Sequence, residues 1–306
     1  MTVRDQLQDT PSNAGGSAGN SSDCTSTVLP VDVDALFRPL RLGNWQLQHR
    51  IVLAPMTRRR CVNSIPPPFV GDYYAQRATP GGLLITEAVS VSASGDGEPV
   101  TPGIWSDEQT EAWRQVVQTV RSRVPDVVLV MQLWHKGRCC HSDFLPGNQL
   151  PVAPSPIANT YRTVANSQGV MVPYETPKEL TVDEISTIVG DFRRASHNAK
   201  LAGFDGVEIH GANGYLVDQF LETSTNMRTD AYGGTVENRI RFCAEVTRAA
   251  IDAFGPGFVG IRFSPFGQFN GMHDEDPVRL FTAAIRKVTQ LGVAYVHLVW
   301  FIHCKA

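Results

Sequence analysis

The chain has 306 residues, of which 42% are hydrophobic and 19% are charged, so it can bury a substantial core. This composition excludes a disordered polymer. The 27 Lys and Arg residues against 30 Asp and Glu residues give a formal net charge of −3, so no basic excess points to nucleic acid. The longest apolar runs, such as 127–133, are far shorter than the roughly 18 residues of a membrane-spanning helix. Neither nucleic acid nor a membrane is expected as a partner.

The first thirty residues, 1–30, are rich in Ser, Gly, Asn and Thr and lack the apolar pattern of a folding segment. We therefore expect a disordered tail, followed by one domain over 31–306. The tail has no apolar signal core, and its single arginine stands among three aspartates, which is unlike a transit peptide. The cysteines lack zinc spacing, and the adjacent pair Cys139 and Cys140 is too strained for an ordinary disulfide. Reduced thiols and a cytoplasmic location are expected.

Six short apolar runs rich in β-branched residues predict strands over 51–56, 83–88, 127–133, 206–212, 258–264 and 295–301. Helical periodicity separates most of these runs. Capping-box patterns mark the helix starts at Ser106 and Thr181. A third helix is predicted over 236–254, with Gly255 and Pro256 as its stop signal.

Apolar strands that alternate with amphipathic helices predict a parallel sheet, either an open doubly wound sheet or a (β/α)8 barrel of the TIM type. The first strand-to-helix turn, at 54–58, has no glycine, whereas an open dinucleotide-binding sheet needs a glycine-rich turn there. Polar residues follow several strands, which is how a barrel builds a site on one rim. The sequence therefore favours the α/β barrel. Six prolines between 136 and 180 predict a loop that acts as a lid over this rim.

The strand ends offer mostly hydrogen-bond donors, with only two acids, Glu87 and Glu208. A metal-dependent hydrolase would need several acids or paired histidines, so we rank that function low and expect no metal site. A donor-rich rim instead suits a group that becomes negative during reaction, such as an enolate oxygen or a reduced flavin. The donors are Gln132, Trp134, His210, Asn213, Tyr215 and Arg262.

The stretch 210–216 is the most informative, because two glycines after a strand end let His210, Asn213 and Tyr215 turn into one pocket. Each residue alone has another interpretation: an isolated His is more often packed or on the surface, and Tyr215 could be a core or interface aromatic. Glu208 could be a general base, but an interior acid with hydrogen-bonded partners is favoured.

The loop after the third strand carries histidines, basic residues and two thiols, for which we expect no catalytic role. His135 and His141 are interpreted as lid or solvent residues beside Lys136 and Arg138, with phosphate binding as a minor alternative. No base is placed near the adjacent cysteines, so neither is expected to be a nucleophile.

Several sequence blocks stand out in order along 35–299. They include Ala54-Pro55-Met56-Thr57-Arg58, Leu84-Ile85-Thr86-Glu87-Ala88, Gln132-Leu133-Trp134-His135-Lys136-Gly137-Arg138, His210-Gly211-Ala212-Asn213-Gly214-Tyr215-Leu216 and Ile261-Arg262-Phe263-Ser264-Pro265. In these blocks and their order the sequence resembles the Old Yellow Enzyme group of FMN-dependent ene-reductases, including its oxophytodienoate reductase-like branch.

The resemblance implies two sets of site residues. Residues that line the FMN would be Pro55, Met56, Thr57, Ala88, Gln132 and Arg262, with Thr57 and Gln132 bonded to the flavin ring and Arg262 stabilising its reduced anion. His210 and Asn213 would bind the substrate carbonyl, and Tyr215 would deliver a proton. NADPH or NADH would reduce the flavin, which then reduces the C=C bond of an enone or enal in a ping-pong cycle.

Six predicted strands are used by residue 301, whereas a barrel of this kind needs eight. Residues 300–306 also depart from the family pattern, so a chain truncated at its C-terminus is expected. The alternative function is therefore an inactive barrel fragment without flavin. His49, where the family commonly has Asn, lies outside the expected pocket. The natural substrate and the oligomeric state do not follow from the sequence.

Overall fold

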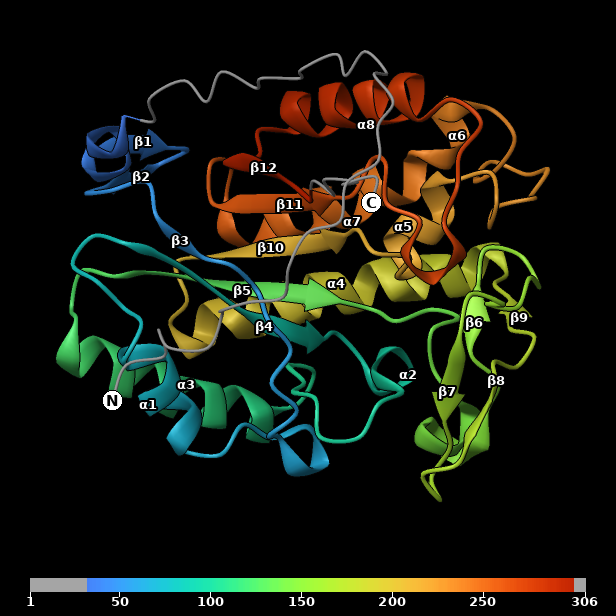
Figure 1. Cartoon of the computed structure of the whole chain (residues 1–306), viewed down its shortest axis with the longest axis horizontal. Helices are drawn as coiled ribbons and strands as arrows, with labels where there is room; N and C mark the ends of the chain where they lie inside the picture. Colours follow the sequence, from blue (N-terminus) through green and yellow to red (C-terminus); the bar gives the residue numbers. More distant parts are fainter. Residues whose placement is uncertain (1–31, 300–306) are drawn as a thin grey trace, which may run out of the picture. The chain divides into compact units, whose positions relative to one another are not determined.

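The computed structural model describes residues 32–299. The predicted tail 1–30 and the divergent segment 300–306 lie outside these residues, and the predictions for them stay predictions. Six parallel strands form one sheet in the order β3-β4-β5-β10-β11-β12 (Figure 1). Their bounds are β3 Val52–Leu53, β4 Leu83–Ser90, β5 Val128–Trp134, β10 Gly206–Gly211, β11 Val259–Phe263 and β12 Tyr295–Leu298.

The spatial order of these strands follows their order in the chain, and every neighbouring pair is parallel. A doubly wound sheet would instead reverse direction at a switch point. The topology therefore agrees with the barrel prediction. The residues that the structure describes supply six of the eight strands of such a barrel.

The first strand is shorter than predicted. We expected it over 51–56, but β3 pairs with β4 only at Val52 and Leu53. Pro55 cannot donate to a strand ladder, which explains the early end of β3. Thr57 consequently lies in the loop beyond the strand, four residues after its last paired position.

Both predicted helix starts are confirmed. Helix α3, Asp107–Arg123, begins at a reciprocal capping box between Ser106 and Gln109, and α4, Val182–Ala202, begins at one between Thr181 and Glu184. The predicted single helix over 236–254 was wrong in one respect. It is divided at Ile240 into α6 Val236–Arg239 and α7 Arg241–Phe254. The ψ angle of Ile240 is −8°, which is far from the value of about −42° in a regular α-helix.

The remaining helices and strands are short, apart from α8. They are η1 Val33–Phe37, β1 Leu40–Leu42, β2 Trp45–Leu47, η2 Val62–Ser64, α1 Phe69–Ala75, α2 Ala93–Asp96, η3 Ser142–Phe144, η4 Pro146–Asn148, β6 Val152–Ala153, β7 Thr163–Ala165, β8 Met171–Pro173, β9 Lys178–Glu179, α5 Leu216–Leu221, η5 Phe269–Gly271 and α8 Pro277–Leu291. Among the described residues, no helix is long and apolar enough to cross a membrane.

Strand residues alternate between two environments. Leu129, Met131 and Ile209 face outward into the main core, which α3, α4, α7 and α8 cover along the outer face of the sheet (Figure 1). Val128 and Val130 face the other way and join a second core cluster. This second cluster includes Trp45 and Leu47 of the β1–β2 hairpin, so the hairpin closes the amino end of the sheet interior with apolar side chains.

The segment between β5 and α4 has little helix, as its prolines predicted. It contains two 3-10 turns, η3 and η4, the antiparallel hairpin β7–β8, and the short parallel pair β6–β9. The segment follows the carboxyl end of β5 (Figure 1). Its role as a lid stays a prediction.

Gly260 of β11 leaves space for the ring of Tyr295, and a larger residue would not. A Cβ at this position would lie 2.6 Å from both Cε atoms of the Tyr295 ring, which crosses from the adjacent strand β12. We therefore expect Gly260→Ala to destabilise the protein by about 1–3 kcal/mol through overpacking. Urea denaturation followed by tryptophan fluorescence measures this change.

Gly190→Ala in α4 is the matched control, because a Cβ there meets no atom within 4 Å. Alanine favours a helix interior over glycine by about 1 kcal/mol, so this variant is expected to be neutral or more stable. Equal stability of the two variants would contradict the packing argument.

Candidate active site

Strand register places polar side chains in two rows inside the curved sheet. The lower row is formed by Gln132, Glu208, Gly260 and Tyr295, which are aligned across β5, β10, β11 and β12, with Ala88 of β4 beside Gln132. Two residues further along each strand, nearer the carboxyl ends, lies an upper row. Its members are Ser90, Trp134, His210, Arg262 and His297.

Glu208 is the centre of the lower row. Its carboxylate is fully buried and accepts hydrogen bonds from Gln132 Nε2 at 2.7 Å and from the Tyr295 hydroxyl at 2.9 Å. His297 Nδ1 lies 3.1 Å from the same carboxylate. The interpretation of Glu208 as an interior, hydrogen-bonded acid is confirmed. The bond from Gln132 also fixes its amide, because the nitrogen is committed to Glu208 and the oxygen is left for another partner.

Trp134 is the platform of the upper row. The ring of His210 stacks on it at 6.1 Å with an interplanar angle of 18°, and the Tyr215 ring meets it edge-on at 4.8 Å. His210 and Tyr215 are also in edge contact, at 4.9 Å. The indole N–H donates to Ser90 at 3.0 Å, so the expectation that Trp134 offers a donor at the rim was wrong.

Burial and neighbouring charges set the protonation of these groups. Burial lowers the pKa of His210 well below its ordinary value, and the nearby Arg262 and His297 lower it further. A neutral imidazole carries one N–H. The Ala212 amide donates to His210 Nδ1 at 3.4 Å, which leaves the proton on Nε2. Burial raises the pKa of Tyr215, which keeps its hydroxyl protonated.

Four residues, 212–215, join β10 to α5, with a tight turn at Asn213 and Gly214. Asn213 and Gly214 both have left-handed backbones, with φ of 59° and 75°. Asn and Gly are the residues that tolerate this conformation best. Tyr215 follows as the N-cap residue of α5, so the turn brings the predicted trio of His210, Asn213 and Tyr215 to one strand end.

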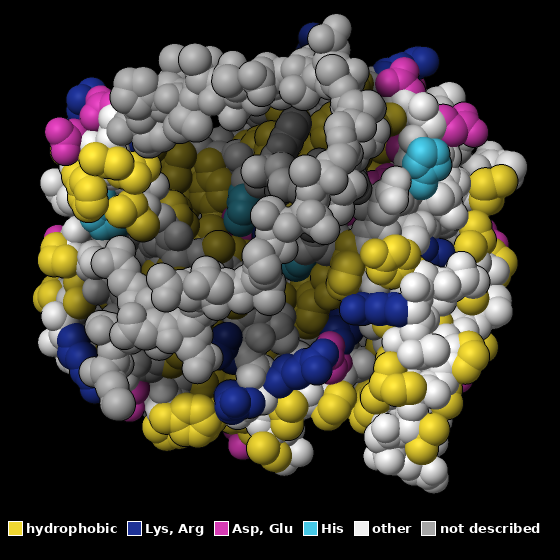
Figure 2. Space-filling view, viewed as in Figure 1, with side chains coloured by type: hydrophobic (Ala, Val, Ile, Leu, Met, Phe, Trp, Pro, Cys, Tyr) yellow, Lys and Arg dark blue, Asp and Glu magenta, His cyan; other side chains and the backbone are white. Residues whose placement is uncertain are grey.

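The residues expected to line a flavin are divided between the two rows of the sheet interior and the loop after β3. Ala88 and Gln132 lie in the lower row, and Arg262 lies in the upper row. Pro55, Met56 and Thr57 follow β3 instead, where Met56 and Thr57 are exposed. The protein surface is hollowed over the sheet, with histidine side chains visible inside (Figure 2).

The chemistry of this hollow fits a planar ring that becomes anionic. Arg262 Nε is buried without a hydrogen-bond partner among the described residues. The guanidinium is therefore a positive group with N–H donors left to give, and the amide oxygen of Gln132, in the lower row, is also left for another partner. A flavin ring offers both an acceptor edge and an N–H donor, so these side chains suit it.

Comparison with known proteins decides the family. Residues 35–301 match the model of the NADH:flavin oxidoreductase / NADH oxidase family. The chain is 45% identical to 12-oxophytodienoate reductase 1 of Oryza sativa subsp. japonica over 265 residues, which are 86% of this chain and 68% of that protein. It is 42% identical to 12-oxophytodienoate reductase 2 of Arabidopsis thaliana, covering 86% of this chain and 70% of the relative. The chain belongs to this family.

Solved structures agree with the assignment to this NADH:flavin oxidoreductase family. Morphinone reductase in complex with tetrahydroNAD matches with a TM-score of 0.82 and 42% identity, covering 86% of this chain and 73% of that one. The Old Yellow Enzyme homologue from Zymomonas mobilis matches with a TM-score of 0.81 and 40% identity over the same shares. The resemblance to the Old Yellow Enzyme group and the partial (β/α)8 barrel are confirmed. The protein is a flavin- and nicotinamide-dependent oxidoreductase of this family.

The interpretation of His135 as a solvent residue was wrong. His135 is only 1% exposed, and its neighbour Lys136 is only 3% exposed. The loop folds inward: Lys136 pairs with Glu98, and Arg138 donates to the carbonyls of Ile157 and Asn270. Burial lowers the pKa of His135 to about 3 and that of Lys136 to about 8.

The two thiols of this loop behave as expected. Burial raises the pKa of Cys139 to about 11 and that of Cys140 to about 12, so both stay protonated at neutral pH. A thiol of this kind is a poor nucleophile. All four described cysteines are free.

Sequence reasoning missed several residues that hold the Asn213–Gly214 turn. Asp218 and Gln219 in α5, and Ser264 and Asn270 after β11, all bond to its backbone. One signal was available: Asp218 and Gln219 are polar residues inside the apolar run 216–221. Asn270 gave no such signal, because it lies 57 residues away from Asn213.

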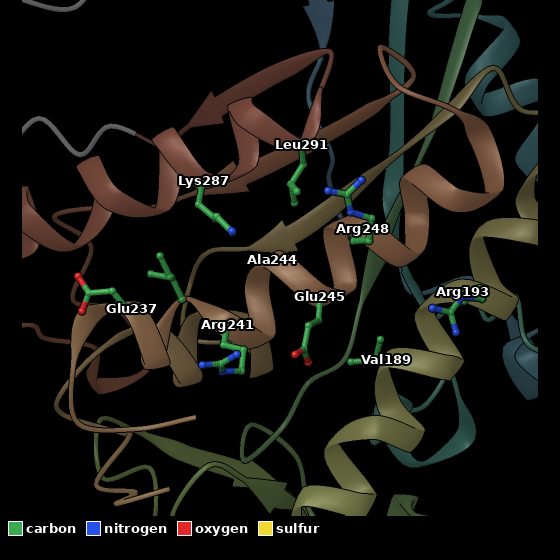
Figure 3. A pocket seen from close by; sticks show the side chains of 10 residues that line it. Val189, Arg193, Glu237, Arg241, Ala244, Glu245, Arg248, Lys287 and Leu291 are labelled. Atoms are coloured by element: carbon green, nitrogen blue, oxygen red, sulfur yellow. The ribbon is translucent and has the colours of Figure 1, made fainter. Parts of the chain in front are cut away.

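A cavity of about 550 Å³ lies elsewhere, on the outer surface between α4, α6, α7 and α8 (Figure 3). Its lining includes Arg193, Arg241, Arg248 and Lys287 on the outward faces of these helices. The helices separate this cavity from the interior rows, so it is not part of the candidate active site.

Proposed function

We propose that this protein is an ene-reductase, which uses FMN and NAD(P)H to reduce the C=C bond of α,β-unsaturated carbonyl compounds in a ping-pong cycle. The observation that carries the proposal is the edge contact between His210 and Tyr215, next to the half-buried guanidinium of Arg262 on the neighbouring strand, with Asn213 in the turn between the two rings. Such a site stabilises negative charge on a carbonyl oxygen and on a reduced cofactor. The relatives 12-oxophytodienoate reductase 1 and morphinone reductase are named as reductases, which supports the proposal.

The residues that would hold FMN are Ala88, Gln132 and Arg262 in the sheet interior and Pro55, Met56 and Thr57 in the loop after β3. When bound, the flavin supplies hydride transfer from the nicotinamide to the β-carbon of the substrate. Gln132, held by Glu208, would offer its amide oxygen to an N–H group of the flavin. Arg262 would offer its half-buried guanidinium to negative charge on the ring, and its partial removal from solvent would strengthen that attraction.

The substrate carbonyl would accept hydrogen bonds from His210 Nε2 and the Asn213 amide. Because His210 is held neutral by burial, it donates without giving up its proton. Charge grows on the carbonyl oxygen as hydride arrives at the β-carbon, and removing one such donor from a dry site typically costs about 2.7–4 kcal/mol of barrier. The two donors are therefore expected to stabilise the transition state of hydride transfer more than the bound substrate.

Tyr215 would complete the reduction by giving its proton to the α-carbon. Its hydroxyl is kept protonated by burial, and its ring is fixed in edge contact with both Trp134 and His210. A positioned acid of this kind typically contributes a factor of about 10²–10⁴ to rate. The expected partner is a small enone or enal. The free thiols of the described cysteines favour the cytoplasm as the compartment of the protein.

The decisive experiment is purification of the 306-residue protein followed by visible absorption spectroscopy. We expect a flavin spectrum, FMN as the flavin released on denaturation, and NADPH- or NADH-dependent reduction of 2-cyclohexen-1-one. A colourless protein that takes up no added FMN would favour the flavin-free fragment. Elemental analysis for bound zinc tests the metal-hydrolase alternative in the same preparation.

His210→Ala is expected to lower kcat/KM for 2-cyclohexen-1-one by about 10²–10³-fold, since one donor to the carbonyl is lost. Flavin content should not change, because His210 is assigned to the substrate. Steady-state kinetics and flavin absorbance measure both quantities. His197→Ala, on the exposed face of α4, is the control and should match the wild-type protein. Loss of flavin from His210→Ala would show that this residue is misassigned.

Tyr215→Phe is expected to slow reoxidation of the reduced flavin by the enone by about 10²-fold or more, because the proton donor is absent. Reduction of the flavin by NADPH needs no such proton and should change far less. Stopped-flow absorbance separates the two half-reactions, so each serves as the control for the other. Equal slowing of both would contradict the proton-donor role.

A further inference from the structure

All four backbone polar groups of the Asn213–Gly214 turn are bound by side chains. The Asn213 N–H donates to Ser264 Oγ at 2.8 Å, and the Asn213 carbonyl accepts from Asn270 Nδ2 at 2.8 Å. The Gly214 N–H donates to Asp218 Oδ2 at 2.8 Å, and the Gly214 carbonyl accepts from Gln219 Nε2 at 2.7 Å. Backbone groups bond mostly to other backbone groups or to water, so it is unusual that side chains bind every backbone N–H and C=O group of this turn.

The turn is also confined by packing. A Cβ on Gly214 would lie 2.7 Å from Asn270 Cβ and 2.9 Å from Met272 Cγ, so the backbone touches the segment that follows β11. Ser264, Asn270 and Asp218 are at most 1% exposed. Buried hydrogen bonds of this kind are costly to break, because the freed partner has no water to replace them.

The four partners have two different origins. Asp218 and Gln219 belong to α5, which directly follows the turn, so their bonds are local. Ser264 and Asn270 come from the segment after β11, the strand that carries Arg262. The Ser264 hydroxyl also lies 3.4 Å from Asp218 Oδ2, as donor to it. Ser264 and Asn270 therefore tie the turn after β10 to the end of the neighbouring strand.

Asn270 extends this tie to the segment between β5 and α4. Its side-chain oxygen accepts from Asn159 Nδ2 at 3.3 Å, and its backbone carbonyl accepts from Arg138 at 3.0 Å. One buried amide thus connects Asn213 with the predicted lid.

We propose that Ser264 and Asn270 are positioning residues that hold the Asn213 amide near His210 and Arg262. The substrate carbonyl would then meet the donors of His210 and Asn213 at once. This inference rests on the proposed function, in which Asn213 binds the carbonyl. Removing either residue leaves the local bonds from Asp218 and Gln219, so the fold is retained while Asn213 gains freedom. Small misplacements of a binding group are expensive in an active site.

Three variants test the proposal. Ser264→Ala removes the acceptor for the Asn213 N–H. Asn270→Gly removes the side-chain donor without backbone strain, because Asn270 has φ of 62°. Asn270→Asp keeps the shape but replaces the donor amide nitrogen with an acceptor oxygen. The control is Ser196→Ala, which deletes an equally buried hydroxyl bonded to a carbonyl within α4, away from the turn.

Loss of one hydrogen bond to the turn is expected to lower kcat/KM for 2-cyclohexen-1-one by roughly tenfold in each test variant, with wild-type flavin content. Ser196→Ala should keep wild-type kcat/KM. In an Asn213→Ala background, Ser264→Ala should have no further effect, because its influence passes through the Asn213 side chain. Wild-type kinetics in all three variants, or a full additional loss in the Asn213→Ala background, would overturn the proposal.

Hydrogen exchange of the peptide spanning 210–221, followed by mass spectrometry, gives a readout that needs no catalysis. Ser264→Ala should speed exchange in this peptide, and Ser196→Ala should not. If the wild-type protein reduces no enone, the proposed function fails, while the exchange rates still decide whether Ser264 holds the turn. Unchanged exchange in Ser264→Ala would overturn the positioning role.

Discussion

The site depends on one buried carboxylate. Glu208 lies at the centre of the sheet interior, where an unpaired charge would be prohibitively costly. Gln132, Tyr295 and His297 all make polar contacts with it, and Arg262 lies in the next row with the opposite charge. These contacts fix the orientation of residues from three strands. The upper row, where substrate chemistry is proposed, is built on this arrangement.

Much of this arrangement could be predicted from the sequence because it follows from strand periodicity. Residues two apart share a face, so Glu208 and His210 had to point the same way, and the chain order of the strands set their neighbours. Helix starts were equally local: the Ser106 and Thr181 capping boxes need only four residues. The order of motifs then identified the family, which the comparisons confirmed.

What the sequence could not provide was the set of distant partners. The early end of β3, the break at Ile240 and the inward course of the loop at His135 all depend on contacts with other segments. The bonds of Asn270 to Asn213 and Asn159 cross 57 and 111 residues of chain, and no local pattern encodes such pairs. The roles of His210, Asn213, Tyr215 and the flavin-lining residues stay predictions, although the structure brings the trio together.

Trp45 and Leu47 close the amino end of the sheet interior with apolar side chains, so the solvent lies on only one side of the charged groups along the strand direction. Hydrocarbon fills the amino end, so water cannot weaken the fields of Glu208 and Arg262 from that direction. A reactant in the upper row would displace water on the opposite side of these charges. A larger reactant would displace more water and so interact more strongly with Glu208 and Arg262, which couples the size of a reactant to the electrostatic stabilisation it receives.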